Sequence, residues 1–398
     1  MVAYKSQKPE REFTNLQGIV HLLYMQIAVN TRFLIKNQME GYGYFIQEIF
    51  SRLSKNYPEH QFIFLFDRPY NKNFLFEKNV TPVIVSPKAR HGLSFKWWYD
   101  VKVPIALKKY KADVFISPDG FCSLLTRIPQ VLVIHDLAFV HHPKFIERHH
   151  RIFYKYYTPK FIKKAKVVAT VSEFSRKDII KQYRVAENKI LNIGSAAKAI
   201  FQPIDWKEKE AIKEAYADGC EYFVFVGGIH PRKNLINLLK AFSLFKTRQH
   251  TNMKLLVAGR LAWKYNKTLE KLKLYKFKDE VKMLGYLPEE QLAKIVAGSY
   301  ALVFPSFFEG FGVPILEGMQ CGVPVITSNT SSMPEIGGEA ALYADPNNPV
   351  DIAEQMKLIF KDENLRSRLI DKGKVQAQKY SWDKTAELMW KAIQQAVS

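Results

Sequence analysis

The sequence predicts an α/β protein in which parallel sheets are covered by helices on both faces. Short apolar runs with strand character alternate with helical patterns along the chain, an order typical of parallel sheets. The chain has 398 residues, of which 47% are hydrophobic and 24% charged, so it can hold two globular domains with separate cores. We find no internal repeat of fixed period and no low-complexity segment, which leaves this alternation as the guide to the fold.

Five strands and two helices are expected in the first half of the chain. The segment 43–53 has the apolar spacing of a helix with one buried face. Ser172 suits the N-cap position of a second helix, which is expected to end at Tyr183. The strands are expected at 26–29, 61–66, 114–116, 131–134 and 167–171.

The second half repeats the alternation and ends in a helix at 382–397. Its strands are expected at 222–226, 254–258, 281–284, 301–304 and 323–326. The segment 193–203 is the expected linker, and Met25 would make a natural first residue. The predicted organisation is an extension at 1–24, an N-terminal domain at 25–198, a C-terminal domain at 199–380 and a terminal helix at 381–398.

Composition favours a cytosolic protein. No apolar run approaches the roughly 18 residues that span a bilayer, and the N-terminus lacks the apolar core of a signal peptide. Cys122, Cys220 and Cys321 are far apart and form no CxxC pair, so neither a disulfide framework nor a cysteine metal site is expected.

A net charge of +21, from 59 Lys+Arg against 38 Asp+Glu, predicts anionic partners. Basic residues crowd two stretches, 88–111 and 144–166, and Trp97 and Trp98 lie within the first. Cations beside aromatic side chains suit the surface of an anionic membrane. A solvated basic face that keeps the protein soluble is an equally good interpretation. Nucleic-acid binding is less favoured, since no known binding module accompanies the charge.

The segment 307–329, FFEGFGVPILEGMQCGVPVITSN, is the most informative in the chain. Glu309 and Glu317 bracket a turn that contains Gly310 and Gly312, and a helix follows the turn. On one continuous helix, positions eight apart differ in direction by about 80°. With Glu309 in the loop and Glu317 in the first helical turn, both carboxylates can instead approach one ligand. The alternative is a solvated Glu309 and a Glu317 that only complements the helix dipole.

The flanks of this segment place it at the ligand-binding edge of a sheet. Apolar strands are expected on both sides, so the order is strand, glycine loop, helix, strand. Pro314 suits the first helical position, and Gly322 suits the residue after the last turn. Open α/β sheets bind ligands at the carboxyl ends of their strands, which is where this loop is predicted to lie.

A second loop, GGIHPRKN, follows the strand predicted at 222–226. Asn234 is expected to cap the next helix through its side chain. Arg232 and Lys233 then lie at the positive end of that helix, where a cation is disfavoured by up to about 1 kcal/mol. An anion between them and the helix would remove this penalty, and phosphate suits both side chains. The alternative is that both side chains extend into water.

The chain contains no Asp-x-Asp pair, so we do not expect a divalent cation to bridge a diphosphate to two carboxylates. Arg232 and Lys233 would then have to offset the charge of such a leaving group. One well-placed group of this kind commonly contributes about 3 kcal/mol to transition-state stabilisation.

Taken together, these motifs resemble the GT-B glycosyltransferases of the large retaining family that includes bacterial mannosyl- and glucosyltransferases (glycosyltransferase group 1, family 4). The resemblance covers about 26–398. Its most specific parts are FEGFGVPILEGMQCGVPVITSN and FVGGIHPRKNL, and weaker ones are VIHDLAFVHHP, TVSEFSRKDII and MEGYGYF. It implies two facing Rossmann-like, doubly wound domains with a deep cleft between them. A nucleotide-sugar donor, a GDP- or UDP-hexose, would bind there without metal or other cofactor, and the terminal helix would return to the N-terminal domain.

The resemblance also implies roles for the residues of the glycine loop. Glu309 would bind hydroxyls of the donor sugar, and Glu317 would bind the ribose hydroxyls. The backbone N–H groups of Gly310, Phe311 and Gly312 would face the sugar or the phosphates.

The remaining site residues carried by the resemblance come from four other segments. Arg232 and Lys233 would hold the diphosphate, and His135 would lie beside the transferred sugar. Tyr286 and Leu287 would be walls for the base, and Gly228 would also bind the donor. Gly41 and Gly43 belong to the Gly41-Tyr42-Gly43 loop, which would close over the diphosphate.

The implied reaction is transfer of a hexose of mannose or glucose type, with retention, to a growing surface glycan or a lipid-linked acceptor. The acceptor would attack the face from which the diphosphate leaves, and a phosphate oxygen would take its proton. Peripheral contact with the inner face of the cell membrane fits the basic first half. Two alternatives remain: a GT-B sugar-nucleotide epimerase or hydrolase, and a non-catalytic protein that binds nucleotide sugar or nucleic acid.

Two positions depart from the family pattern, and one competing site is present. Tyr44 stands where relatives often carry Arg, and the linker lacks the more usual Asn-Gly turn. The pairs His141-His142 and His149-His150 invite a zinc interpretation, which is not favoured because no helical HExxH pair or nearby thiolate accompanies them.

Overall fold

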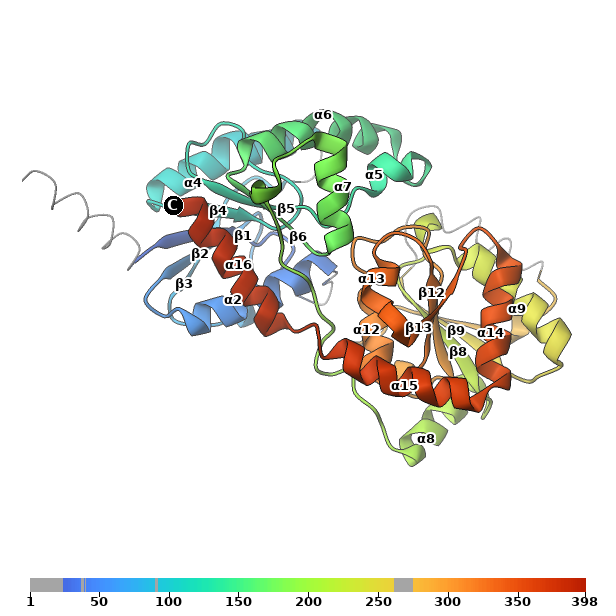
Figure 1. Cartoon of the computed structure of the whole chain (residues 1–398). Helices are drawn as coiled ribbons and strands as arrows, with labels where there is room; N and C mark the ends of the chain where they lie inside the picture. The colour runs from blue at the N-terminus through green and yellow to red at the C-terminus, as the bar shows by residue number, and fades with distance from the viewer. Residues whose placement is uncertain (1–23, 37–38, 40, 90–91, 261–274) are drawn as a thin grey trace, which may run out of the picture. The chain divides into compact units, whose positions relative to one another are not determined.

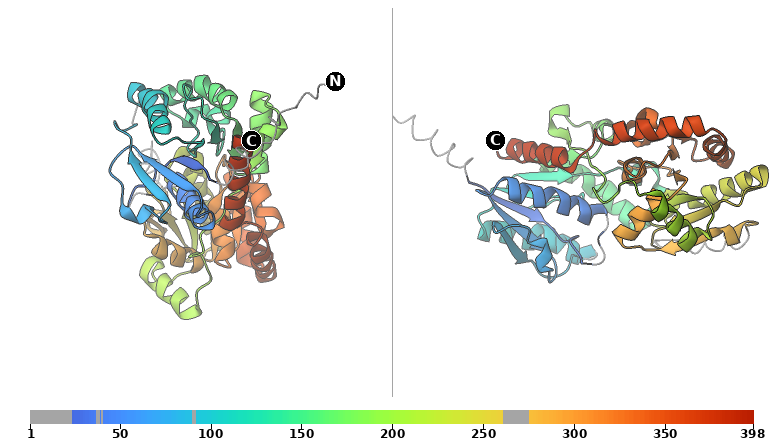
Figure 2. Two further views of the ribbon diagram at one scale, coloured as in Figure 1. Left: turned by 90° about the vertical axis from the view of Figure 1, so that its left-hand side faces the viewer. Right: turned by 90° about the horizontal axis from the view of Figure 1, so that it is seen from below.

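The computed structural model describes residues 24–36, 39, 41–89, 92–260 and 275–398 (Figure 1). All but the last residue of the predicted extension at 1–24 lies outside the described residues. The described chain forms a seven-stranded sheet and a six-stranded sheet. Helices lie on both faces of each sheet, as the views in Figures 1 and 2 show. The predicted α/β class is therefore confirmed.

The chain divides into two compact units. Unit 1 comprises Met1–Ile134, Tyr157–Ala169 and Ala386–Ser398, and unit 2 comprises His135–Tyr156 and Thr170–Thr385. Each unit thus draws on segments that are distant in sequence.

The seven-stranded sheet has the order β3-β2-β1-β4-β5-β6-β7, which reverses direction between β1 and β4. The five predicted strands are present, and two edge strands were not predicted. One of these, Val80–Ile84, contains Pro82. Proline has no backbone N–H to donate, and an edge strand tolerates that loss. The strands are β1 Gln26–Asn30, β2 Gln61–Phe66, β3 Val80–Ile84, β4 Val114–Ser117, β5 Gln130–Val133, β6 Val167–Thr170 and β7 Ile190–Asn192.

The six-stranded sheet has the order β10-β9-β8-β11-β12-β13 and reverses between β8 and β11. Its neighbouring strands pair in parallel, and the central strands are fully buried. The strand expected at 323–326 begins two residues later, and the edge strand β13 was not predicted. The strands are β8 Tyr222–Val226, β9 Lys254–Ala258, β10 Val281–Gly285, β11 Ala301–Phe304, β12 Val325–Ser328 and β13 Ala341–Ala344.

The loops GGIHPRKN and FFEGFG follow β8 and β11. These are the two strands between which the order of the second sheet reverses. Parallel strands present their carboxyl ends at one edge, so both loops meet at the topological switch point. The core beneath them contains Phe223, Leu239 and Val303.

Local signals set several helix ends. Ser172 caps α7 as predicted, since its side chain accepts from Ser175 N. Gly322 follows α12 with φ +68°, the left-handed conformation expected after a last turn. The α-helices are α2 Gly41–Asn56, α3 Gly92–Trp97, α4 Val103–Lys109, α5 Ala138–His141, α6 Arg148–Lys164, α7 Glu173–Tyr183, α8 Trp206–Ala217, α9 Leu235–Gln249, α11 Glu289–Ala297, α12 Val313–Gln320, α13 Met333–Gly337, α14 Pro349–Lys361, α15 Glu363–Ala377 and α16 Trp382–Val397.

The last helix contributes to the core of unit 1. Trp390 stacks on Tyr57 with ring centroids 3.8 Å apart, and the His60 ring lies 5.0 Å from the indole. Trp390 is 7% exposed, so the last part of α16 is anchored by a buried aromatic stack. Within the described residues, none of the helices combines the length and apolarity needed to cross a bilayer.

Candidate active site

The centre of the candidate site is a carboxylate held by two cations. Arg232 Nη1 lies 2.8 Å from Glu309 Oε2, and Lys233 Nζ lies 2.9 Å from Glu309 Oε1. The Glu309 residue is 7% exposed. The interpretation in which both cations extend into water is therefore wrong for this structure, because each faces the same buried anion.

Two hydrogen bonds also join the loops that carry these residues. Phe307 N donates to Arg232 O at 2.9 Å, and Arg232 Nη1 donates to Phe308 O at 2.5 Å. Lys233 Nζ lies 4.7 Å from the centroid of the Phe304 ring at the end of β11. The cations are thus fixed against the strand and loop that precede Glu309.

This pairing sets the charge states of the site. Burial alone would raise the pKa of Glu309, but the charges of Arg232 and Lys233 outweigh it and lower the pKa to about 2. Burial lowers the pKa of Lys233 from its ordinary value, while Glu309 opposes that change. Glu309 is consequently an ionised hydrogen-bond acceptor at neutral pH.

His230 positions the cations, a role that sequence reasoning missed. Its Nδ1 accepts from Arg232 N at 3.2 Å and caps the 3₁₀ turn Pro231–Lys233. Burial, then the charges of Arg232 and Lys233, lower the pKa of His230 to about 4. The imidazole is therefore neutral at pH 7, and a histidine directly before Pro-Arg-Lys was the available signal.

Asn234 corrects a prediction. It has φ +62° and its side chain makes no capping hydrogen bond to α9. The amide instead donates to Pro305 O at 2.9 Å and to Pro346 O at 2.7 Å. Asn234 therefore ties together the loops that follow β11 and β13. Its side chain is used for these long-range contacts.

Hydroxyl groups after β12 hold the glycine loop in place. Ser331 Oγ accepts from Glu309 N at 3.0 Å, and Thr330 Oγ1 donates to Phe307 O at 3.1 Å. Ser332 Oγ is shared between Glu309 O and Phe311 O, both at 2.9 Å. The loop that carries Glu309 is thus anchored on both sides of the carboxylate. Sequence reasoning missed these residues, although a Ser/Thr run after a strand was a visible signal.

Glu317 lies further along α12 than predicted. The helix begins at Val313, so Glu317 is its fifth residue and lies beyond the first turn, while Pro314 is the second residue rather than the first. Burial raises the pKa of Glu317 to about 7, with Lys198 opposing and Glu289 adding to the rise. The Glu317 carboxyl group therefore titrates near neutral pH.

Lys198 and Glu289, which pair with each other, are further charged residues around Glu317 that were not predicted. Lys198 lies in the segment expected to be the linker, and Glu289 is the first residue of α11. Tyr286 and Leu287, the predicted walls for the base, lie between β10 and α11, and Tyr286 is 54% exposed.

His135 lies against the glycine loop within unit 2. A Cβ atom on Gly310 would come 2.0 Å from His135 O, so only glycine allows this approach. Gly310 O accepts from Ser172 Oγ at 2.6 Å and from Ser175 Oγ at 3.2 Å. Gly312, with φ +97°, then turns the chain into α12.

The predicted Gly41-Tyr42-Gly43 loop belongs to unit 1 and forms the first turn of α2, which begins two residues before the predicted start. A Cβ atom on Gly43 would lie 2.6 Å from Phe33 O, whereas Gly41 has open space around it. Gly228 follows β8 in unit 2, directly after Gly227.

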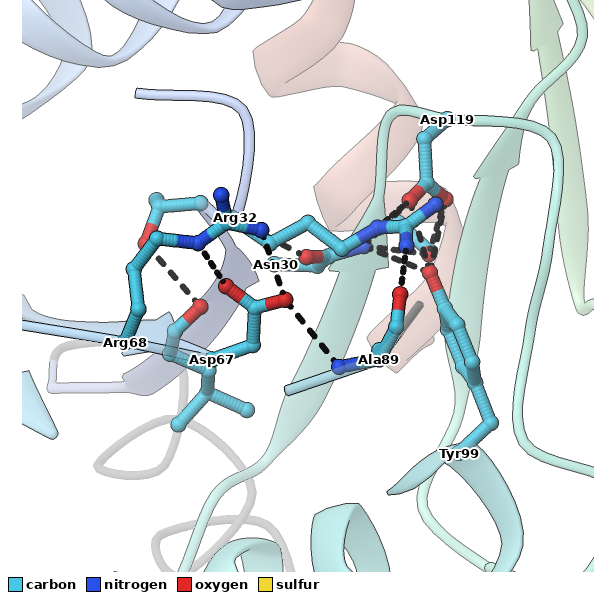
Figure 3. A network of polar contacts seen from close by, with 10 residues as sticks. Asn30, Arg32, Asp67, Arg68, Ala89, Tyr99 and Asp119 are labelled. Atoms are coloured by element: carbon cyan, nitrogen blue, oxygen red, sulfur yellow. Dashed lines mark hydrogen bonds and ion pairs between the residues drawn. The ribbon is translucent and has the colours of Figure 1, made fainter. Parts of the chain in front are cut away.

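Unit 1 has its own polar network at the carboxyl ends of β1, β2 and β4 (Figure 3). Arg32 Nε lies 2.7 Å from Asp119 Oδ2, and the Tyr99 hydroxyl donates to Asp119 at 2.7 Å. Asn30 Nδ2 donates to the same carboxylate at 2.8 Å. Asp67 accepts from Arg68 Nε at 2.6 Å. Asp119 is thus a buried, fully paired acid that holds the loop after β1, and no sequence motif indicated it.

The pairs His141-His142 and His149-His150 have different surroundings in the structure. His141 Nε2 lies 2.8 Å from Asp178 Oδ2, and its ring stacks on Phe308. Among the described residues, Glu147, His149 and His150 bring one ligand atom each within 4.8 Å of the others. Arg148 lies between Glu147 and His149 in the sequence and Arg151 follows His150, and their positive charges disfavour a cation there.

Two protein-family models match this chain. The model for "Glycosyl transferases group 1" matches residues 207–376, and the model for "Glycosyltransferase Family 4" matches residues 41–193. O-antigen chain mannosyltransferase B of Escherichia coli is 30% identical over 280 residues, which cover 70% of this chain and 73% of the relative.

Two solved structures share the fold. Sucrose-phosphate synthase of Thermosynechococcus elongatus superposes with a TM-score of 0.75 and 16% identity, over 93% of this chain and 98% of that one. Anabaena Alr3699/HepE in complex with UDP-glucose gives a TM-score of 0.74 and 14% identity, over 93% and 99%. The fold and the matched models define a GT-B glycosyltransferase. The chain belongs to the glycosyltransferase group 1 and family 4 enzymes.

Proposed function

We propose that this glycosyltransferase moves a hexose from a GDP- or UDP-hexose to a surface-glycan or lipid-linked acceptor, with retention and without a divalent metal. Mannose is the first candidate, since the E. coli relative is named as a mannosyltransferase of the O-antigen chain. HepE, which shares the fold, binds UDP-glucose. Residues 199–380 would hold the donor and 25–198 the acceptor, with 381–398 completing the first domain.

The observation that carries the proposal is the pairing of Glu309 with Arg232 and Lys233. Each of the two cations at the switch point already holds a carboxylate oxygen, which supports binding of negative charge there. A diphosphate presents the same kind of oxygen and would compete with Glu309 for both cations. Glu309, once released from the cations, would accept hydrogen bonds from hydroxyls of the donor sugar.

The proposed reaction uses these groups as follows. The bond between the sugar and the diphosphate breaks, and Arg232 and Lys233 stabilise the charge that develops on the leaving oxygen. The acceptor oxygen attacks the same face, and its proton passes to a diphosphate oxygen. Neutral His230 holds the Arg232 backbone during this step and adds no positive charge. His135 would contact the sugar, and the N–H groups of Gly310, Phe311 and Gly312 would face the donor.

The nucleoside end of the donor would lie towards α11 and α12. Glu317 would accept from the ribose hydroxyls, while Gly228, Tyr286 and Leu287 would line the base and phosphates. We place the protein in the cytosol with peripheral contact to an anionic membrane, because its charge is +21 and its proposed acceptor is lipid-linked.

The test combines donor screening with product analysis. Thermal shift against GDP, UDP, ADP and their hexoses should show selective stabilisation by one nucleotide. Transfer from that donor should persist with EDTA, and NMR should show the anomeric configuration of the donor. Loss of transfer with EDTA, or an inverted product, would refute the metal-independent retaining mechanism. Free sugar or an isomer formed from donor alone would favour the hydrolase or epimerase. No turnover with any donor would favour a binding protein.

A further inference from the structure

Unit 1 exposes bulky apolar side chains along the helical run from α3 through the π-helical turn Trp98–Lys102 to α4. Trp97 is 51% exposed and Ile105 is 58% exposed, with Val101 between them. Trp98, by contrast, is fully buried and its Nε1 donates to Val85 O at 2.8 Å. The two adjacent tryptophans therefore have different roles: Trp98 belongs to the core, and Trp97 does not.

A second segment extends this apolar face. Asp100 Oδ1 accepts from Leu124 N at 2.8 Å, which fixes the loop 124–125 beside the helical run. Leu125 is 68% exposed. The hollow beside Trp97 is lined by Ser94, Lys96, Trp97, Asp100 and Val101. We call Lys96, Trp97, Val101, Ile105 and Leu125 the Trp97 face.

Basic residues accompany the Trp97 face in the sequence. Lys96 pairs with Asp100 and lies 4.5 Å from the centroid of the Tyr157 ring, and Lys160 lies 5.6 Å from the same ring. Lys108, Lys109, Lys111 and Arg127 are exposed. Within the described residues 92–130, each acid is bonded internally: Asp100 to Lys96, Asp113 to Gln26 N and Asp119 to Arg32. Lys and Arg outnumber Asp and Glu there by six to three, so this stretch favours an anionic surface.

We propose that the Trp97 face docks the enzyme on anionic phospholipid. This inference deepens the proposed function, on which it rests, by naming the surface that would bring the enzyme to a lipid-linked acceptor. Charge complementarity favours lipid over a second copy of this chain, because two copies with net charge +21 repel each other. Tryptophan prefers the membrane–water interface, and each lysine near an anionic surface strengthens binding about fivefold.

The experiment is co-sedimentation of the full chain with vesicles of phosphatidylcholine, with or without one-third phosphatidylglycerol. The wild type should bind the phosphatidylglycerol vesicles and release them at high salt. Trp97→Ser and the pair Lys108→Glu with Lys109→Glu should each weaken binding at least about fivefold. Trp206→Ser is the matched control: Trp206 is 70% exposed on α8 of unit 2, beside Asp205 and Glu208, and its loss should change nothing.

A second readout separates this proposal from the proposed function. Melting temperature and its shift on adding GDP or UDP should be the same in the Trp97→Ser variant and the wild type, because Trp97 is outside the core. Equal binding of both vesicle types, or unchanged binding after Trp97→Ser, would overturn the proposal. So would displacement of the wild type from vesicles into a DNA complex, or a dimer that Trp97→Ser converts to a monomer. A failed donor screen with intact vesicle binding would refute only the proposed function.

Discussion

Glu309 Oε2 lies 2.8 Å from Arg232 Nη1, although the two residues belong to loops that follow different strands, β11 and β8. The site thus supplies its own anion to a pair of cations that are expected to hold a diphosphate. Such an internal pair keeps the cations oriented, and a ligand with more anionic oxygens can displace the carboxylate.

Arg232→Ala should lower turnover about 100-fold or more, because one stabiliser of developing charge is lost while Lys233 still pairs with Glu309. Initial rates of transfer from the best donor would measure this. Arg248→Ala is the control, since Arg248 lies on α9 with its side chain 44% exposed and pairs with Glu354 at the surface. Near-normal turnover of the Arg232 variant would refute its assignment.

Glu309→Gln should destabilise the protein by about 3 kcal/mol at neutral pH, because two cations lose their buried counter-charge. The pKa of Glu309 is lowered to about 2, so its contribution to stability is present above its ordinary pKa and is lost as pH falls towards 2. Urea unfolding at several pH values would therefore show the gap between wild type and variant closing in acid.

Pyrophosphate should stabilise the Glu309→Gln variant more than the wild type, since no carboxylate competes with it for the cations. Thermal shift with pyrophosphate would measure the difference. Glu339→Gln is the matched control: Glu339 pairs with Lys372 on the surface, with its side chain 88% exposed. Equal stability of the Glu309 variant and the wild type at every pH would contradict the role of the pair.

Donor affinity should fall as pH decreases through about 7, where the raised pKa of Glu317 lies. Below that pH the carboxyl group is protonated and can no longer accept from two ribose hydroxyls. The loss should approach about tenfold per pH unit, as measured by calorimetry with the nucleoside diphosphate. Glu317→Gln should bind weakly at all pH values and remove the slope. A variant that retains the slope would show that another group titrates.

Ser332→Ala should reduce stability by about 1 kcal/mol and lower transfer, because the hydroxyl donates to Glu309 O and Phe311 O. Thr247→Ala removes a hydroxyl that donates within α9, to Ser243 O, and should leave transfer unchanged. Kinetics and thermal unfolding of both variants provide the comparison. If the two behave alike in transfer, the hydroxyl does not position the loop.

Local patterns in the sequence determined most of the fold. Apolar runs predicted the central strands of both sheets, and Ser172 and Gly322 marked helix ends correctly, because each signal acts within a few residues. The glycine loop and the GGIHPRKN loop were both assigned to strand ends. The edge strands β3, β7 and β13 were missed: Pro82 disguises the first, and β7 has only three residues.

Only the tertiary structure decided how the side chains of the site pair. Arg232, Lys233 and Glu309 meet because β8 and β11 are neighbours in the sheet, and no local spacing encodes that adjacency. Asn234 shows the same limit: its type and position suit a helix cap, yet two distant carbonyls bind its amide. Strand order and register place groups from distant segments within hydrogen-bonding distance, so they determine the electrostatics on which the proposed chemistry depends.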